Sequence, residues 1–277
     1  MSNATNSIRR PVMLYHGSKY RLAPWIISNL PEHKNYVEPF GGGGAVLLRK
    51  NESYHEVYND LNEEVVNVFR VLRDPEKSER LNRQIELTPF SRTEFDQSYE
   101  PGGDDVEMAR KTIVRSFMGW GSKSMQHRSG FRASCREANS TEVDAWNNYP
   151  NEITKFAERF KQVRIENKDA LEVISEQDGP ETLFYLDPPY VMETRNSKHK
   201  YREEYTTEDH RELANLLRSI EGMAVISGYQ CDLYEELYRD WERKDKEART
   251  QANGDSIESI WMNSAAQENQ AQKSLFE

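Results

Sequence analysis

The feature of this sequence that most restricts its fold is an alternation of short apolar runs with longer amphipathic stretches. Each apolar run ends in polar residues or in Gly and Pro, as a short buried strand does. Strands at the runs, with helices between them, predict an α/β sheet that carries helices on both faces. The predicted strands lie at 36–37, 55–58, 163–166, 182–186 and 223–226, and the helical patterns at 61–72, 170–174 and 208–220.

The alternation stops between about Thr88 and Pro150. A helical run over 106–118 is followed there by a stretch that is rich in Gly and Ser. Residues 109–136 hold seven basic residues and no acidic one, although the whole chain has a net charge of −10. Either a solvated helix face with its loop or a groove for a polyanion explains this local reversal of charge.

Composition excludes several classes of protein. No run of 18 apolar residues occurs, and the N-terminus lacks the apolar stretch of a secretory signal, so we expect neither a membrane span nor export. Two cysteines, Cys135 and Cys231, are too few for a disulfide framework or a zinc site. Residues 1–10 and 263–277 have no apolar period, and we expect both ends to be disordered.

A glycine cluster follows Glu38-Pro39-Phe40 at the end of the first predicted strand. Four consecutive glycines let the backbone approach a ligand closely, and the helix that follows offers unpaired N–H groups at its N-terminus. The segment has neither the lysine of a phosphate-binding P-loop nor the spacing of the dinucleotide fingerprint. Glu38 would repel a pyrophosphate, and it suits a ligand with a positive charge, such as an ammonium or a sulfonium.

Asp60 ends the next predicted strand, about 20 residues after the glycines. A carboxylate at that position can accept hydrogen bonds from a ribose diol. It can equally cap a helix that begins at Leu61, since Asp is favoured at helix N-caps. The residues alone leave both interpretations open.

The segment Asp187-Pro188-Pro189-Tyr190 directly follows an apolar strand. The two prolines remove two N–H donors and stiffen the turn, which leaves the Asp187 carboxylate and the Pro188 carbonyl as acceptors. Tyr190 adds a flat aromatic face. Two acceptors beside a ring suit a planar heterocycle that bears an amino group, although an ordinary proline turn can have the same residues.

Taken in order, these motifs resemble the Dam-type DNA adenine methylases, which transfer a methyl group from S-adenosylmethionine to the exocyclic amino group of adenine. The resemblance covers about residues 12–262. Glu38 to Gly44 matches the family's E/D-P-F-x-G-x-G loop, Asp187 to Tyr190 its D-P-P-Y, and Tyr15 to Lys19 its W/Y-x-G-G-K with Ser18 in place of the second glycine. The motif order is that of the family's alpha arrangement. Segments 115–119, 127–132 and 258–263 look most like phage and prophage members.

The resemblance implies a Rossmann-like, S-adenosylmethionine-dependent methyltransferase sheet at 11–88 and 151–262, with a small, mostly helical and loop target-recognition insert at 89–150. It implies a site-specific enzyme that methylates the N6 amino group of adenine in double-stranded DNA after base flipping. The implied cofactor is S-adenosyl-L-methionine. A cytoplasmic setting, in a prokaryotic cell or a phage-infected host, follows, with no membrane and no obligate protein partner.

The resemblance also assigns roles to individual residues. Lys19 would face the carboxylate of the cofactor, Asp60 its ribose and Asp169 its adenine. The implied catalytic residues are Asp187, Pro188 and Tyr190, and the implied cofactor-binding residues are Tyr15, Lys19, Glu38, Phe40, Gly42, Gly44, Asp60, Asp169 and Asp187. The candidate DNA-binding cations are Arg115, Lys123, Arg128, Arg132, Arg136, Lys198 and Lys200.

The sequence bears on three other functions. Methylation of cytosine C5 needs a cysteine nucleophile, usually after a proline, yet Cys135 follows Ser134 and Cys231 follows Gln230. An amino-methylating enzyme that acts on RNA, or on a glutamine in a protein, stays open as an alternative. So does a DNA-binding relative without catalytic activity, although the intact Asp187–Tyr190 turn and Lys19 argue against it.

Overall fold

The structure is a computed structural model, and it describes residue 8 and residues 10–15, 17–121, 124, 128–133, 142–191, 205–250 and 254–276. The chain divides into two compact units, each built from three segments. Unit 1 comprises Met1–Arg21, Gly42–Asn51 and Asn62–Asn167, and unit 2 comprises Leu22–Gly41, Glu52–Leu61 and Lys168–Glu277. Among the described residues, no helix is long and apolar enough to cross a membrane.

Unit 2 is built around a mixed sheet. Its strands run in the order β2-β1-β4-β5-β7-β6. Strands β2, β1, β4 and β5 are parallel to one another, and β7 is antiparallel to both of its neighbours, β5 and β6. The strands are β1 (Asn35–Glu38), β2 (His55–Asn59), β4 (Thr182–Leu186), β5 (Met223–Gly228), β6 (Glu242–Thr250) and β7 (Gly254–Met262). The helices of this unit are α1 (Ala23–Ser28), α9 (Ala170–Gln177), α10 (Thr207–Ser219), α11 (Asp232–Leu237) and α12 (Ser264–Phe276).

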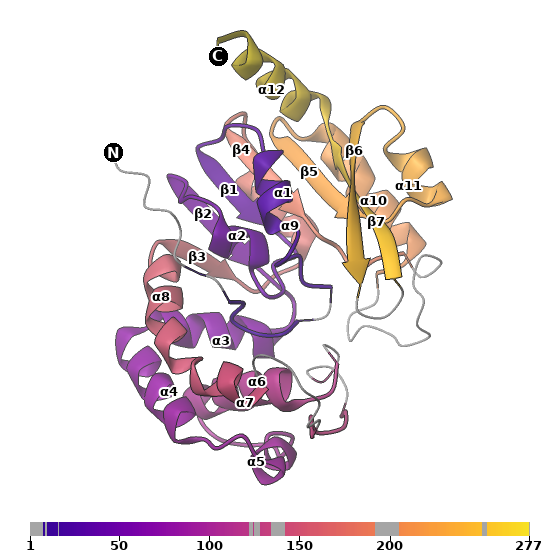
Figure 1. Ribbon diagram of the computed structural model, residues 1–277. Helices are drawn as coiled ribbons and strands as arrows, with labels where there is room; N and C mark the ends of the chain where they lie inside the picture. Colours follow the sequence, from indigo (N-terminus) through magenta and orange to yellow (C-terminus); the bar gives the residue numbers. More distant parts are fainter. Residues whose placement is uncertain are drawn as a thin grey trace. The chain divides into compact units, whose positions relative to one another are not determined.

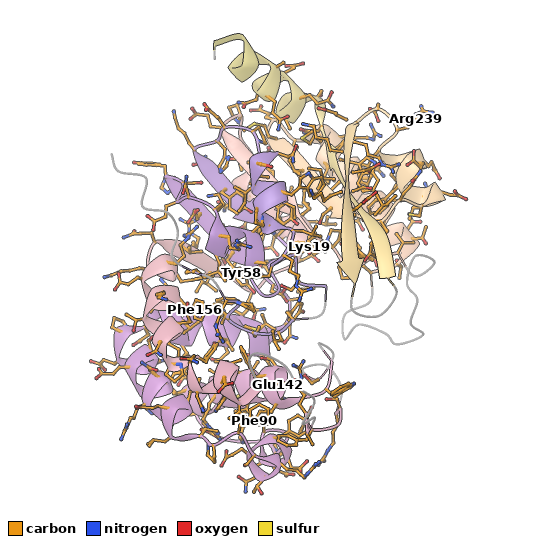
Figure 2. All side chains as sticks on the ribbon, viewed as in Figure 1. Lys19, Tyr58, Phe90, Glu142, Phe156 and Arg239 are labelled. Atoms are coloured by element: carbon orange, nitrogen blue, oxygen red, sulfur yellow. The ribbon has the colours of Figure 1, made fainter. Side chains whose placement is uncertain are left out.

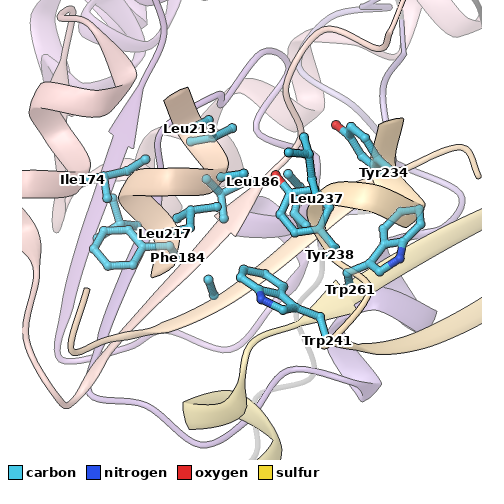
Figure 3. Packing of buried hydrophobic residues seen from close by; sticks show 14 of the residues in the cluster. Ile174, Phe184, Leu186, Leu213, Leu217, Tyr234, Leu237, Tyr238, Trp241 and Trp261 are labelled. Carbon is cyan, nitrogen blue, oxygen red and sulfur yellow. The ribbon is translucent and has the colours of Figure 1, made fainter. Parts of the chain in front are cut away.

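Helices cover both faces of this sheet. Figure 1 shows α1 on the near side of the strands, and α9 and α10 on the far side. The far side carries a large buried cluster, in which inward-facing strand residues such as Phe184 and Leu186 pack against α9, α10 and α11 (Figure 3). Figure 3 also shows Tyr234, Tyr238 and Trp261 meeting in the same cluster. The predicted α/β sheet with helices on both faces is therefore confirmed.

Unit 1 is mostly helical. It contains α2 (Ala45–Arg49), α3 (Glu63–Arg73), α4 (Pro75–Leu87), α5 (Arg92–Gln97), α6 (Asp105–Met118), α7 (Glu142–Asn147), α8 (Pro150–Phe160) and the strand β3 (Val163–Glu166). Phe69 of α3 stacks on Phe160 of α8 with ring centroids 4.5 Å apart. The Trp146 indole donates to the Thr88 carbonyl oxygen at 2.7 Å, and the Tyr149 hydroxyl to that of Val12 at 2.6 Å.

The predicted recognition insert lies within a larger compact unit. The sequence placed its boundaries at 89 and 150, where the strand pattern stops. In the structure, residues 62–88 and 151–167 belong to the same compact unit as residues 89–150. The reason is packing, because α3 buries a continuous apolar face that includes Val65, Phe69 and Leu72, and α6, α4 and α8 pack against this helix.

All five predicted strands form, and a sixth and a seventh were missed. The two additional strands are the hairpin β6–β7 at one edge of the sheet. The sequence of β6, ERKDKEART, has no apolar alternation by which it could be predicted. Its charged residues are typical of an edge strand, where they prevent pairing with another chain.

The expectation of a disordered tail at 263–277 is wrong. Residues 264–276 form α12, and Asn263 ties its start to the sheet. The Asn263 side chain accepts from the backbone N–H groups of Ala224 and Ala266, both at 3.0 Å, and donates to the Gly222 carbonyl at 3.0 Å. The connection is made by amide hydrogen bonds, so it leaves no apolar period in the sequence.

The expectation of disorder at 1–10 is also wrong for the residues that can be described. Ile8 is only 4 % exposed, and its carbonyl accepts from the Tyr20 hydroxyl at 3.2 Å. Arg10 donates to the Ala145 carbonyl at 3.2 Å. Residues 1–7 and 9 lie outside the described residues.

Candidate active site

The carboxyl ends of the parallel strands in unit 2 carry the acidic residues that the sequence singled out. Glu38 is the last residue of β1, Asp60 follows β2 and Asp187 follows β4. Parallel strands end at one edge of a sheet, so the fold gathers these carboxylates on the side where α/β sheets bind ligands.

Glu38 is a buried carboxylate with a fixed donor. It is 2 % exposed and accepts a hydrogen bond from the Tyr36 hydroxyl at 2.7 Å. Burial and the nearby Glu38 raise the pKa of Tyr36 well above its usual value, so the phenol keeps its proton and remains a donor. Phe40, two residues later, is half-buried and meets the edge of Tyr205 with ring centroids 5.4 Å apart.

Asn59 is a residue of this edge that the sequence reasoning missed. It is fully buried, and its amide nitrogen donates to the carbonyls of Pro39 at 2.9 Å and Lys168 at 3.1 Å. Its amide oxygen accepts from the Lys168 backbone N–H at 2.9 Å. One side chain therefore holds together the loops after β1 and β3. In the sequence, only its position directly before Asp60 indicates that Asn59 belongs to the site.

The structure excludes one of the two interpretations of Asp60, that of a helix cap. Helix α3 begins at Glu63 rather than Leu61, and its N-cap is Asn62, whose side chain accepts from the Glu64 N–H at 3.1 Å. Asp60 is half-buried and is not the cap of this helix. Asp169, by contrast, caps α9 by accepting from the Leu171 N–H at 2.8 Å.

Two glycines of the loop have backbone conformations that other residues rarely adopt. Gly42 has φ +48° and Gly44 has φ +62°. Gly41, within unit 2, is required for a different reason, because an added Cβ would lie 2.2 Å from the ring of Tyr58, which Figure 2 labels. The loop thus depends on glycine at three positions.

The N-terminal motif lies in unit 1. Lys19, also labelled in Figure 2, is 4 % exposed and donates to the Gly17 carbonyl at 3.0 Å. Tyr15 is half-buried, and its ring would lie 3.0 Å from a Cβ added at Gly42. Tyr15 therefore lies against Gly42 of the glycine loop, within unit 1.

Asp187 is held by the neighbouring strand. Its Oδ1 atom accepts a hydrogen bond from the Ser227 hydroxyl of β5 at 2.9 Å, and the Asp187 residue is half-buried. Burial raises the pKa of Tyr185 well above its usual value, and the negative charges of Asp187, Glu38 and Glu258 raise it further. Three carboxylates therefore lie close enough to this buried phenol to raise its pKa.

Tyr190 is held in place by a residue of the β6–β7 hairpin. Its ring is 8 % exposed, and its hydroxyl donates to the Oε2 atom of Glu258 on β7 at 2.9 Å. The ring meets the edge of Tyr229 with centroids 4.8 Å apart. Burial raises the pKa of Tyr190 well above its usual value, so its hydroxyl stays a donor to Glu258. Pro188, between the two functional side chains, is buried.

The predicted DNA-contacting cations have different surroundings. Arg115 is 13 % exposed at its side chain and forms an ion pair with Glu64 at 3.0 Å within unit 1. Arg128 is 64 % exposed and lies over the Tyr99 ring. Arg132 donates to the Gly119 carbonyl at 2.7 Å, and burial lowers the pKa of its guanidinium. Lys123, Arg136, Lys198 and Lys200 lie outside the described residues.

Comparison with known proteins decides the family. Residues 15–252 match the D12 class N6 adenine-specific DNA methyltransferase family. The chain belongs to this family. Its fold is the Rossmann-like methyltransferase fold, and the protein is an adenine-specific DNA methyltransferase.

Relatives of this D12 methyltransferase span bacteria and archaea. It is 28 % identical to the Type II methyltransferase M1.LlaDCHI of Lactococcus lactis over 88 % of this chain and 89 % of the relative. It is 23 % identical to the Type II methyltransferase M.MjaIII of Methanocaldococcus jannaschii, over 88 % and 93 %. It is 26 % identical to the Retron Ec67 DNA adenine methylase of Escherichia coli, over 83 % and 81 %.

Proposed function

We propose that the protein transfers the methyl group of S-adenosylmethionine to the N6 amino group of adenine in double-stranded DNA, at the Asp187–Tyr190 turn. The observation that carries the proposal is the arrangement of this turn. Asp187 is oriented by Ser227 at 2.9 Å, and Tyr190 is anchored by Glu258 at 2.9 Å. A fixed acceptor beside a fixed aromatic ring suits a planar base that bears an amino group.

The residues at this edge suit the cofactor. Glu38 and Glu258 are buried carboxylates, and with Asp187 they favour a cationic ligand such as a sulfonium. Asp60 is half-buried, and Asn62 rather than Asp60 caps α3; we assign the Asp60 carboxylate to the ribose diol of the cofactor. We assign Glu38, Phe40, Gly42 and Gly44 to the same cofactor, Lys19 to its carboxylate, Tyr15 to its methionine end and Asp169 to its adenine side. When bound, S-adenosylmethionine supplies an electrophilic methyl group on a positively charged sulfur.

The chain's own contribution is to make the amino nitrogen nucleophilic. The lone pair of adenine N6 is delocalised into the ring. If the Asp187 carboxylate and the Pro188 carbonyl each accept one amino hydrogen, the nitrogen becomes more tetrahedral and its lone pair turns toward the methyl carbon. With S-adenosylmethionine bound, this nitrogen would take the methyl group as the C–S bond breaks and leaves a neutral thioether, and the nitrogen would release one proton to solvent. Alignment of this kind is worth effective molarities of about 10⁵ M or more.

A base inside a duplex cannot reach such a site, so the target adenine has to be extruded at a cost of a few kcal/mol. Stacking on Tyr190, worth about 1–3 kcal/mol, offsets part of this cost. We assign recognition of the duplex to unit 1, where Arg128 and Arg132 lie in the basic segment. Lys123, Arg136, Lys198 and Lys200 keep their assignment as phosphate contacts.

Methyl transfer to three acceptors tests the substrate. The purified protein is given S-adenosylmethionine with a labelled methyl group, together with duplex DNA, a structured RNA or a protein mixture. We expect label in duplex DNA, and at most trace label in the other two. Label chiefly in RNA or protein would favour the alternative amino-methyltransferases, and no label in any acceptor would favour a non-catalytic relative.

The Asp187→Ala variant tests the role of the turn. We expect its single-turnover rate of methyl transfer to fall below a tenth of the wild-type rate, because one of the two acceptors is lost. Asp178→Ala is a matched control, since Asp178 lies at the opposite end of β4 and accepts from the N–H groups of Glu221 and Gly222. The control should lose stability and keep its rate. A rate above a tenth of wild type for Asp187→Ala contradicts the assignment.

A further inference from the structure

The register of the sheet places a serine beside the acceptor carboxylate. Strands β4 and β5 are parallel neighbours, with Leu186 opposite Ile226. The next residues are Asp187, directly after β4, and Ser227, within β5. Tyr185 and Val225 form the pair before, so Tyr185, Asp187 and Ser227 share one face of the sheet.

These three side chains form a continuous line of hydrogen bonds. The Tyr185 hydroxyl lies 3.2 Å from the Ser227 Oγ atom, and the Ser227 Oγ atom lies 2.9 Å from Asp187 Oδ1. Ser227 has one proton to donate, and the Leu186 carbonyl oxygen competes for it at 3.3 Å. The carboxylate is both closer and charged, and charge-assisted hydrogen bonds are the stronger kind.

The direction of the line follows from the protonation of Tyr185. This residue is 3 % exposed, and burial raises the pKa of its hydroxyl well above the usual value. The phenol therefore keeps its proton and donates it to the Ser227 oxygen. That oxygen is then an acceptor toward Tyr185, and its own proton is directed to Asp187.

We propose that Ser227 and Tyr185 are positioning residues for methyl transfer. Through its hydrogen bond to Oδ1, Ser227 fixes the rotation of the Asp187 carboxylate, and Tyr185 fixes the direction in which the Ser227 hydroxyl points. This inference rests on the proposed function, because it gives Ser227 a task only if Asp187 is the acceptor for the amino group. Neither residue has to touch the cofactor or the base.

The proposal separates the rate of the chemical step from binding. In the Ser227→Ala variant, the single-turnover rate should fall about tenfold or more, the usual effect of losing a hydrogen bond to a charged group. The dissociation constant for S-adenosylhomocysteine should stay within threefold of wild type. Ser227→Thr keeps the hydroxyl and should recover most of the rate. Tyr185→Phe should lose several-fold in rate, because the Ser227 proton can then turn to the Leu186 carbonyl.

Ser259→Ala is the matched control. Ser259 is another buried serine that donates to an aspartate, Asp245, at 2.7 Å, on the strand next to β5. Its loss should lower the melting temperature as much as Ser227→Ala does and leave the rate unchanged. An equal loss of rate in both variants would show that Ser227 acts only through stability.

A double-variant cycle shows whether Ser227 acts through Asp187. In the Asp187→Ala background, where no carboxylate is left for Ser227 to orient, the added Ser227→Ala change should lower the single-turnover rate less than twofold. A full tenfold further loss would overturn the proposal, and so would a wild-type rate for Ser227→Ala alone. If the rate of Asp187→Ala itself stays above a tenth of the wild-type rate, the proposed function fails instead.

Discussion

Three polar residues at and just after the end of β2 have different surroundings. Asn59 is buried and links the Pro39 and Lys168 loops, whereas Asn62 caps α3. Asp60 stands between them, and its carboxylate is not required by that helix. A sequence can show that an acidic residue follows a strand, but it cannot show which of several polar neighbours takes the cap. That choice depends on where the apolar face of α3 begins, and exposed Leu61 is not part of that face.

At the residue scale we predict that Lys19→Ala and Asp60→Ala both weaken cofactor binding. Loss of a hydrogen bond to a charged group costs about 1.5–3 kcal/mol, so the affinity for S-adenosylhomocysteine should fall about tenfold or more in each variant. Calorimetric titration measures this change. Lys34→Ala is the control, because Lys34 forms an exposed ion pair with Glu181 at 2.5 Å. Unchanged affinity in both test variants would contradict the cofactor assignments.

At the scale of elements, the sequence predicted the parts that are driven by apolar burial. The five strands predicted from short apolar runs are all present, and α6 and α10 form within two residues of their expected bounds. The hairpin β6–β7 was missed because β6 has no apolar alternation, although the end of β7 buries Ile260, Trp261 and Met262. Helix α12 was missed because the side-chain amide of Asn263 ties its start to the sheet. The hairpin nevertheless supplies Glu258, the partner of Tyr190. The sequence therefore predicted the site residues that belong to a motif. It did not predict Asn59, Ser227 and Glu258, which hold those residues in place, because their positions depend on how the strands pair and a single sequence does not show that pairing.

The element-scale prediction concerns Asn263, which ties α12 to the sheet. Its side chain makes three hydrogen bonds to backbone groups of Gly222, Ala224 and Ala266. Each of these hydrogen bonds contributes about 0.5–1.5 kcal/mol, so Asn263→Ala should lower the free energy of unfolding by roughly 2–4 kcal/mol. Hydrogen exchange should show faster exchange in α12 than in β1. Gln267→Ala, which removes a single bond to the Met262 carbonyl, should have a smaller effect. Unchanged protection of α12 in Asn263→Ala would mean that other contacts hold the helix.

At the scale of the whole molecule, charge is divided unevenly along the chain. The protein has a net charge of −10, yet residues 109–136 contain only basic charges. An acidic protein binds DNA only where cations are gathered, and each phosphate contact releases counterions. The division into two compact units places this basic segment in unit 1 and the Asp187–Tyr190 turn in unit 2. Substrate recognition and chemistry are thus assigned to different parts of the chain.

The prediction at this scale is a change in salt dependence. Arg128→Ala should weaken DNA binding, and the slope of log affinity against log salt concentration should decrease by about one unit. Binding is measured by fluorescence anisotropy over a series of salt concentrations. Arg239→Ala removes an exposed arginine of unit 2, labelled in Figure 2, and should leave the slope unchanged. Equal slopes for wild type and Arg128→Ala would remove Arg128 from the DNA interface.

The identity of the methylated nucleoside tests the account most directly. Mixed-sequence duplex DNA is incubated with the protein and labelled S-adenosylmethionine, digested to nucleosides and separated by chromatography with mass detection. We predict that the label appears in N6-methyl-2′-deoxyadenosine, because the Asp187–Tyr190 turn offers two acceptors for an exocyclic amino group beside an aromatic ring. Label in a methylated cytosine, or no labelled nucleoside from a folded protein that binds S-adenosylhomocysteine, would contradict the account.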